Sequence, residues 1–309
     1  MEFRALRPHE LPSWFDVVAR GFGQSRDYFV RHWESDPHAL LEGIRVAVEG
    51  ERIVSTLRVF PRTIFLGGLP VPVGGIGEVC TDEAYRGRGL SGRLLEDAIR
   101  FMAGREMVLS VLFAGRHSLY SRFGWKPVPM RMATARLRPE PGPYECAPAN
   151  PRHPAEARQL QLIHQRFAPQ FQGATVRSDL AYWTGWVAGE WKRALIARRD
   201  GQVRGYLAAN WTGPEELYLE DFAALPGEAE PLLRCAVAAL AQERSLREVR
   251  LRYPAALAIG LNPEAHDLNQ GPMYRVLLPQ LLPMAAAQAL EQMIRGEIEQ
   301  HLIWQTDWF

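Results

Sequence analysis

The sequence has few cysteines, almost no lysine and no long apolar run, and each scarcity excludes a class of protein. The cysteines Cys80, Cys146 and Cys235 are odd in number and scattered, so they fit neither a disulfide framework nor a metal-ligand spacing. We expect free thiols in a reducing compartment. No apolar stretch approaches the ~20 residues of a membrane span, and Met1–Arg7 lack the apolar core of a secretory signal. A soluble, cytoplasmic protein without a metal is expected.

The charges nearly cancel. Lysine and arginine total 36 against 35 aspartate and glutamate, which leaves a formal net charge of +1. Such a balance does not drive association with nucleic acid or an anionic membrane, so neither is expected as a partner. Only Lys126 and Lys192 are lysines. The positive charge is therefore almost all arginine, which suits phosphate binding.

A length of 309 residues predicts about two domains. We expect a mixed α/β (α+β) chain with a first domain at 1–138, a proline- and glycine-rich linker at 139–154 and a second domain at 155–280. Residues 281–309 would add a helix and an aromatic tail.

The first half predicts alternating strands and helices. A short strand at 3–6 precedes helices at 10–22 and 26–33, a hairpin and an extended run that ends near Cys80. Leu90, Leu94 and Met102 recur at helical spacing, and the apolar run 108–113 predicts a central strand. The same order returns after the linker, where a turn at 200–201 matches the turn at 49–50. This predicts an internal repeat.

The segment 78–92 carries the most specific chemistry. A strand leads into a loop with three glycines, Gly87, Gly89 and Gly92, and two arginines, and the loop opens a helix. Glycines let backbone N–H groups approach a ligand, and a helix N-terminus offers unpaired donors and a positive dipole end. This combination suits a pyrophosphate. The spacing fits neither the nucleoside-triphosphate loop nor the dinucleotide fingerprint.

Together with a downstream motif, this loop resembles a known superfamily. Arg86-Gly87-Arg88-Gly89-Leu90, followed by a helix, a strand and Tyr120-Ser121-Arg122-Phe123-Gly124-Trp125, is similar to the GNAT N-acetyltransferases, and most of all to the enhanced-intracellular-survival (Eis) enzymes with tandem domains. The motifs span about 77–128, and the resemblance extends weakly to about 274. Two features depart from it: Ser91 stands where glycine or alanine is usual, and the segment after Leu277 is too short for the third, sterol-carrier-like domain of Eis proteins.

The resemblance implies acetyl-CoA as co-substrate and a role for each matching residue. Val79, Cys80 and Thr81 would hydrogen-bond the pantetheine arm, and Tyr120 would protonate the departing thiolate. The pyrophosphate would be held by Arg86, Gly87, Arg88, Gly89, Leu90, Ser91 and Gly92, and the adenosine or lower arm would be flanked by Gly115 and Arg116. The alternative for Tyr120 is a core tyrosine bonded to the backbone. His117, beside the motif, is expected to be a capping or surface residue.

The resemblance also suggests a general base, the terminal carboxylate of Phe309. Trp304, Trp308 and Phe309 give the tail an apolar character that is unusual for a disordered end. An α-carboxyl ordinarily titrates near ~3.3–3.7, and burial would raise its pKa toward a useful range. Alternatively, the tail packs only on the second domain's sheet, and Glu78 acts through a water.

The second half has Glu220 and Asp221 where a phosphate loop is expected, and no arginine–glycine motif. We expect a degenerate second GNAT-like domain that shapes the acceptor pocket. The leading function is acetyl transfer to a primary amine of a small or polycationic molecule. The alternatives are transfer of a longer acyl chain and a non-catalytic acyl-CoA-binding module, and a homo-oligomer is possible.

Overall fold

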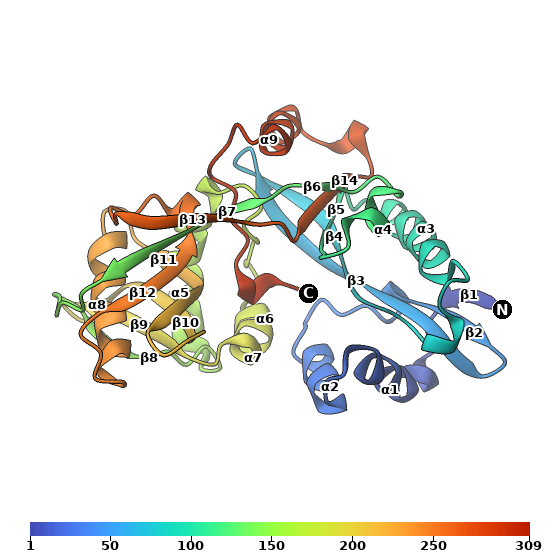
Figure 1. Ribbon diagram of the computed structural model, residues 1–309, viewed down its shortest axis with the longest axis horizontal. Helices are drawn as coiled ribbons and strands as arrows, with labels where there is room; N and C mark the ends of the chain where they lie inside the picture. The colour runs from blue at the N-terminus through green and yellow to red at the C-terminus, as the bar shows by residue number, and fades with distance from the viewer.

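The computed structural model describes all 309 residues. It contains two seven-stranded mixed sheets flanked by helices, which confirms the predicted mixed α/β class. The sheets lie side by side, and the C-terminal segment runs between them (Figure 1). No helix has the length and apolar character needed to cross a membrane.

The first half forms its elements close to where local sequence patterns predict them. Helix α1 buries Trp14, Phe15 and Val18 and is capped at its C-terminus by Gly23, whose φ of 64° favours glycine. The Ser25 side chain caps α2 by accepting the Tyr28 N–H. The elements are β1 (Glu2–Ala5), α1 (Leu11–Phe22), α2 (Arg26–Glu34), β2 (Ile44–Glu49), β3 (Arg52–Leu66), β4 (Leu69–Thr81), α3 (Leu90–Gly104), β5 (Leu109–Phe113), α4 (His117–Ser121) and β6 (Lys126–Pro127).

The rest of the chain adds eight strands and five helices. These are β7 (Met130–Leu137), β8 (Glu145–Pro148), α5 (Pro154–Phe167), α6 (Leu180–Tyr182), α7 (Ala188–Glu190), β9 (Ala194–Arg199), β10 (Gln202–Trp211), β11 (Glu216–Ala224), α8 (Ala229–Gln242), β12 (Val249–Pro254), β13 (Pro263–Asn269), β14 (Pro272–Val276) and α9 (Met284–Arg295). The segment 139–154, expected as a linker, contains β8, which pairs with β9 through Cys146 and Ala197.

The two sheets exchange one strand each. The first sheet has the order β1-β2-β3-β4-β5-β14-β6, and the second has β13-β7-β12-β11-β10-β9-β8. Strand β7 follows the first half in sequence but pairs with β12 of the second sheet, and β14 returns to pair with β5 of the first. Each sheet contains one parallel pair of strands, β4 with β5 in the first and β11 with β12 in the second. The exchanged strand lies next to that pair, β14 beside β5 and β7 beside β12. A boundary at residue 138 therefore does not separate the sheets.

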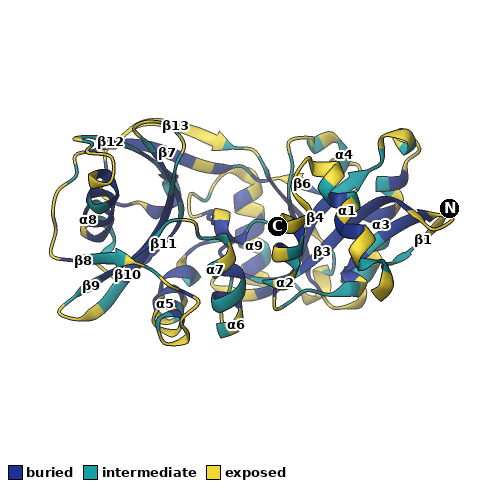
Figure 2. Cartoon of the chain, turned by 90° about the horizontal axis from the view of Figure 1, so that it is seen from below, coloured by how far each residue is buried: buried dark blue, intermediate teal, exposed yellow.

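The cores lie between the sheets and their helices (Figure 2). Helix α3 buries Leu90, Leu94, Leu95, Ala98 and Met102 in a cluster with residues of β2, β3 and β4, which holds the start of α3 beside the end of β4. In the second half, the apolar faces of α5 and α8 join one large cluster with the sheet strands.

Candidate active site

Strands β4 and β5 separate near their ends. Their parallel pairing stops at Ile76 and Leu112, whereas β3 stays paired with β4 up to Ser55 and Thr81. Residues 77–81 consequently present a strand edge that β5 does not cover. The β3–β4 register shifts between Thr56 and Arg58, and Glu78 has a φ of 53° at this bulge. Bulges of this kind redirect a strand next to a site.

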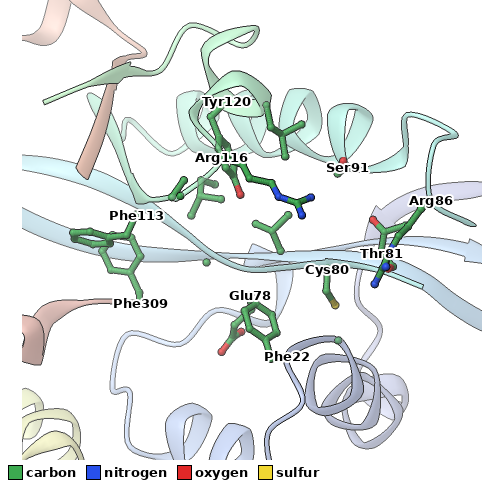
Figure 3. A pocket seen from close by; sticks show the side chains of 17 residues that line it. Phe22, Glu78, Cys80, Thr81, Arg86, Ser91, Phe113, Arg116, Tyr120 and Phe309 are labelled. Carbon is green, nitrogen blue, oxygen red and sulfur yellow. The ribbon is translucent and has the colours of Figure 1, made fainter. Parts of the chain in front are cut away.

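A cavity of about 560 Å³ opens at this separation. It is lined by nine of the residues that the sequence predicts for the site, and most of them are labelled in Figure 3. These nine are Val79, Cys80, Thr81, Arg86, Ser91, Gly115, Arg116, Tyr120 and Phe309. They come from β4, the loop after it, the start of α3, the segment between β5 and α4, α4 itself and the C-terminus. The fold thus brings together residues far apart in sequence.

Five predicted residues do not line the cavity. Leu90 is buried in the core under α3, and a Cβ added at Gly92 would lie 2.9 Å from the Phe123 ring. The Arg88 guanidinium donates to the Ala84 carbonyl at 3.0 Å and lies over the Tyr85 ring. Gly87 and Gly89 have φ values of 77° and 72°, so both shape the loop backbone.

The start of α3 leaves backbone donors free. Gly89 is the N-cap, no side chain caps the helix, and the first helical N–H to find a partner is that of Arg93. The N–H groups of residues 90–92 have no partner in the protein. Arg86 lies beside them and donates from Nε to the Thr81 carbonyl at 3.4 Å. The loop offers both donors and positive charge to an anion.

Tyr120 reaches the cavity from α4. Its ring meets Trp125 edge to face at 6.4 Å, and burial raises the pKa of its phenol. No protein hydrogen bond involves its hydroxyl group, so the alternative of a backbone-bonded core tyrosine lacks its defining contact. The phenol is protonated at neutral pH and free to donate.

Phe309 lies at the first sheet, with its ring over Gly75 and its carboxyl group over Gly77. A Cβ added at Gly75 would lie 2.4 Å from the ring, and one at Gly77 would lie 2.8 Å from the carboxyl carbon. The ring stacks on Phe60 at 5.4 Å and contacts Phe113 at 5.5 Å. The tail does not pack only on the second sheet, because its last residue lies on the first.

Glu78, the alternative base, also lines the cavity, on the other side of β4 from Tyr120 and Arg116 (Figure 3). Its side chain is buried, with Oε1 3.3 Å from His32 Nδ1 and 3.7 Å from Arg58 Nη1, and Oε2 has no partner. His117, by contrast, contacts the Gln270 carbonyl through Nε2 at 2.7 Å. This contact fits the capping or surface role that the sequence predicts.

Sequence reasoning missed part of the cavity wall. Gly21 and Phe22 close it at the end of α1, and Ile76, Gly77, Phe113, Ala114 and Leu119 complete the lining. The Gly74-Gly75-Ile76-Gly77 run was the available signal, because glycines within a strand often mark a close approach of another group.

The acidic pair of the second half has a different setting from the one predicted. Asp221 lies within β11, fully buried, and its Oδ2 is 2.8 Å from Arg177 Nη1. Asp221 therefore does not lie in a loop at the position where a phosphate loop was expected. Local sequence could not show this, because Arg177 is 44 positions away in sequence.

Comparison with known proteins relates the first half of the chain to a described domain family. Residues 2–128 match the model of the GNAT acetyltransferase domain. Residues 2–128 form a GNAT domain. An uncharacterised N-acetyltransferase of Streptomyces avermitilis is 27% identical over 128 residues, which are 40% of this chain and 30% of that protein. The chain thus matches less than a third of this relative.

Solved structures extend the likeness over both sheets. A GCN5-related N-acetyltransferase from Anabaena variabilis has a TM-score of 0.70 at 18% identity, over 89% of this chain and 72% of the other. Eis1 from Mycobacterium abscessus has a TM-score of 0.62 at 16% identity, over 90% of this chain and 74% of the other. At these identities the likeness is one of fold.

The GNAT domain has features that fit acetyl-CoA, the co-substrate of this superfamily. The uncovered edge at 77–81 can pair with the amide groups of pantetheine, and the free N–H groups at 90–92 with Arg86 can meet the pyrophosphate. No group of three or more His, Cys, Asp or Glu side chains is arranged to hold a metal ion.

Proposed function

We propose that this protein transfers an acetyl group from acetyl-CoA to a primary amine of a small or polycationic acceptor. The observation that carries the proposal is the cavity at the separation of β4 and β5, which is lined by both Tyr120 and Phe309. A proton donor and a carboxylate at one cavity are what acyl transfer from a thioester to an amine requires.

Co-substrate binding would use the residues named from the sequence. Val79, Cys80 and Thr81 offer the strand edge to pantetheine, and the stretch 86–92 offers backbone donors to the pyrophosphate. Gly115 and Arg116 would flank the adenosine or lower arm. In support, the cavity is lined by residues from all three segments.

The chemistry would be a direct transfer. The amine nitrogen attacks the thioester carbonyl carbon, so a C–N bond forms while a backbone N–H of the β4 bulge stabilises the carbonyl oxygen. The C–S bond then breaks, Tyr120 protonates the thiolate, and the Phe309 carboxylate takes the proton from the amine. Cys80 is an unsuitable nucleophile, because burial, with a smaller contribution from Glu78, raises the pKa of its thiol to about 12.

The space behind Phe309 favours a short acyl group over a long one. The cavity there measures about 10 Å³ and is lined by Phe113, Tyr274 and Phe309 itself. That is no more than one water molecule needs, ~10–15 Å³. A long acyl chain entering along this line would have to displace the Phe309 ring.

The test is thiol release from acetyl-CoA in the presence of spermidine, tobramycin, tyramine or free lysine, with mass spectrometry of the amine. We expect release that depends on at least one amine and yields its acetylated product. Tight binding of acetyl-CoA without release for any amine would contradict the proposal and favour the non-catalytic acyl-CoA-binding module.

The role of Phe309 has its own test. Two glycines added after Phe309 move the carboxylate without removing a side chain, and we expect turnover to fall by ~10²–10⁴-fold, the usual effect of losing a general base. The control carries two glycines before Met1. If turnover survives the C-terminal addition, the base is elsewhere, and Glu78→Gln then tests the next candidate.

A further inference from the structure

The tail is anchored in the second half of the molecule by a buried ion pair. Arg177 donates from Nε to Asp307 Oδ1 at 3.0 Å and from Nη2 to Oδ2 at 2.8 Å, a two-pronged geometry. The Tyr182 hydroxyl donates to Asp307 Oδ1 at 3.1 Å. Arg177 and Asp307 are each 1% exposed. Charge-assisted pairs of this geometry fix orientation as well as distance.

Further bonds hold the residue before Asp307. Trp186 donates from Nε1 to the Thr306 carbonyl at 2.7 Å, and Trp191 Nε1 lies 3.1 Å from Thr306 Oγ1. Each of these partners comes from the segment 177–191, ahead of β9. This segment therefore forms a socket for Thr306 and Asp307, made of Arg177, Tyr182, Trp186 and Trp191.

The socket limits where the terminal carboxylate can lie. Two residues of chain reach at most ~7 Å, so an anchored Asp307 confines the Phe309 carboxyl group to a small volume. Trp308 stacks on Phe113 at 4.9 Å, and Gly75 and Gly77 leave room for Phe309. The tail is thus held by the second half at Asp307 and by the first sheet at Phe309, and the end of the chain lies between the two halves in Figure 1.

We propose that Arg177 is a positioning residue for acetyl transfer: through Asp307, it holds the Phe309 carboxylate against Gly77, in the cavity that Tyr120 also lines. This inference rests on the proposed function of Phe309. The inference assigns a function to the second half of the molecule, because the second half contains the socket. That socket positions the Phe309 carboxylate in the cavity of the first half.

The test is a double-mutant cycle. Asp307→Asn removes the negative charge that pairs with Arg177. Because Arg177 is also paired with Asp221, the substitution leaves no unpaired buried charge. We expect kcat to fall by ~10–10²-fold, the cost of a misplacement near 1 Å, while the KM for acetyl-CoA stays within twofold. In the chain with two glycines after Phe309, the carboxylate is already displaced, so Asp307→Asn should lower kcat no further.

Two further measurements separate positioning from folding. Carboxypeptidase should release Phe309 faster from Asp307→Asn than from the parent chain. Asp267→Asn is the control, because its carboxylate is also paired with an arginine, Arg252, but is 57% exposed. If Asp307→Asn does not fold, Tyr182→Phe, which removes one hydrogen bond to Asp307, takes its place in the cycle with a smaller expected loss.

The outcomes distinguish the two proposals. If the glycine addition leaves turnover unchanged, the role of Phe309 fails, and this inference fails with it. If the glycine addition lowers turnover but Asp307→Asn and Tyr182→Phe do not, only the anchoring is overturned. If the free-energy losses in kcat from Asp307→Asn and from the glycine addition are additive, Asp307 acts independently of the Phe309 carboxylate. That result also overturns the inference.

Discussion

Burial raises the pKa of two side chains at the cavity, Cys80 and Tyr120, with opposite consequences for catalysis. It raises the pKa of the Cys80 thiol, which keeps that group from acting as a thiolate nucleophile, and it raises the pKa of the Tyr120 phenol, which keeps a proton available. The same physical effect removes one candidate mechanism, a covalent acetyl-cysteine, and supports another, proton donation to the departing sulfur.

Tyr120→Phe should separate chemistry from binding. The substitution keeps the ring and its contact with Trp125 but removes the hydroxyl, so we expect the dissociation constant of acetyl-CoA to hold while kcat falls by ~10²–10⁴-fold. Calorimetry and thiol release measure the two quantities. Tyr85→Phe is the matched control, since its hydroxyl bonds to Glu49 outside the cavity. Near-normal turnover in Tyr120→Phe would leave Tyr120 as a packing residue.

The loop between β4 and α3 is the element on which the proposed co-substrate site depends. Its glycines at 87 and 89 have nothing within 4 Å of an added Cβ, so positive φ, rather than crowding within the protein, is what favours glycine there. The helix begins without a side-chain cap, which leaves its first N–H groups available.

Gly89→Glu should abolish the thermal stabilisation that acetyl-CoA gives the protein, because it places a bulky negative side chain where the pyrophosphate is expected. Gly104→Glu, at the other end of α3 and also in open space, is the matched control and should keep the stabilisation. Differential scanning fluorimetry with and without acetyl-CoA measures both. An undiminished shift in a folded Gly89→Glu variant would falsify the assignment of this loop.

Elements with a local signal were predictable, and their partners were not. Helix α3 follows from Leu90, Leu94 and Met102, and β5 from its apolar run, because period and hydrophobicity are properties of neighbouring residues. The pairing of β14 with β5 joins Tyr274 to Val111 across more than 160 positions, and no local pattern specifies it. β8 is four residues long within a segment rich in proline and glycine, so its composition predicted a linker.

The candidate site divides in the same way. The loop 86–92 and Tyr120 were predicted from motifs, whereas the contacts of Phe309 with Gly75 and Gly77 depend on where the tail lies. The anchoring of Asp307 by Arg177 also follows only from the tertiary fold, since 130 positions separate the two residues. A single acidic residue in an aromatic tail gave no indication of its partner.

Two neutral histidines should make the stability of the whole molecule sensitive to acid. Burial, with a smaller contribution from Arg177, lowers the pKa of His164 to about 3, and burial lowers that of His301 to about 4. The unfolded chain binds these protons near pH ~6.5. The contribution of the two neutral histidines to the free energy of unfolding is therefore fully present above pH ~6.5. It decreases as the pH drops toward 4, by up to ~1.4 kcal/mol per pH unit for each histidine.

The measurement is urea unfolding at pH 7.5, 6 and 5. His301→Gln should flatten the dependence, because it removes one titrating group, while His266→Gln, at an exposed position of β13, should leave the slope unchanged. A parent protein whose free energy of unfolding is the same at pH 7.5 and pH 5 would contradict the prediction.

Strand exchange makes the two halves depend on each other for folding. A chain cut after residue 138 would lose β14, so β5 would have an unpaired edge in the middle of its sheet. It would also expose β7, whose Met130, Met132, Ala133, Ala135 and Leu137 are buried against the second half. Each unsatisfied buried backbone group costs ~1–3 kcal/mol, against a total stability of ~5–15 kcal/mol.

We therefore expect fragment 1–138 to be insoluble when produced alone, although it holds the whole GNAT match and all the predicted loop residues. Produced together with fragment 139–309, it should form a soluble complex that binds acetyl-CoA, because β7 and β14 can then pair with their partner strands. Fragment 139–309 alone lacks β7 and should also fail to fold. Gel filtration and scanning fluorimetry of the fragments measure this. A monomeric fragment 1–138 that unfolds cooperatively and is stabilised by acetyl-CoA would contradict the interdependence, since it would show that the first sheet is complete without β14.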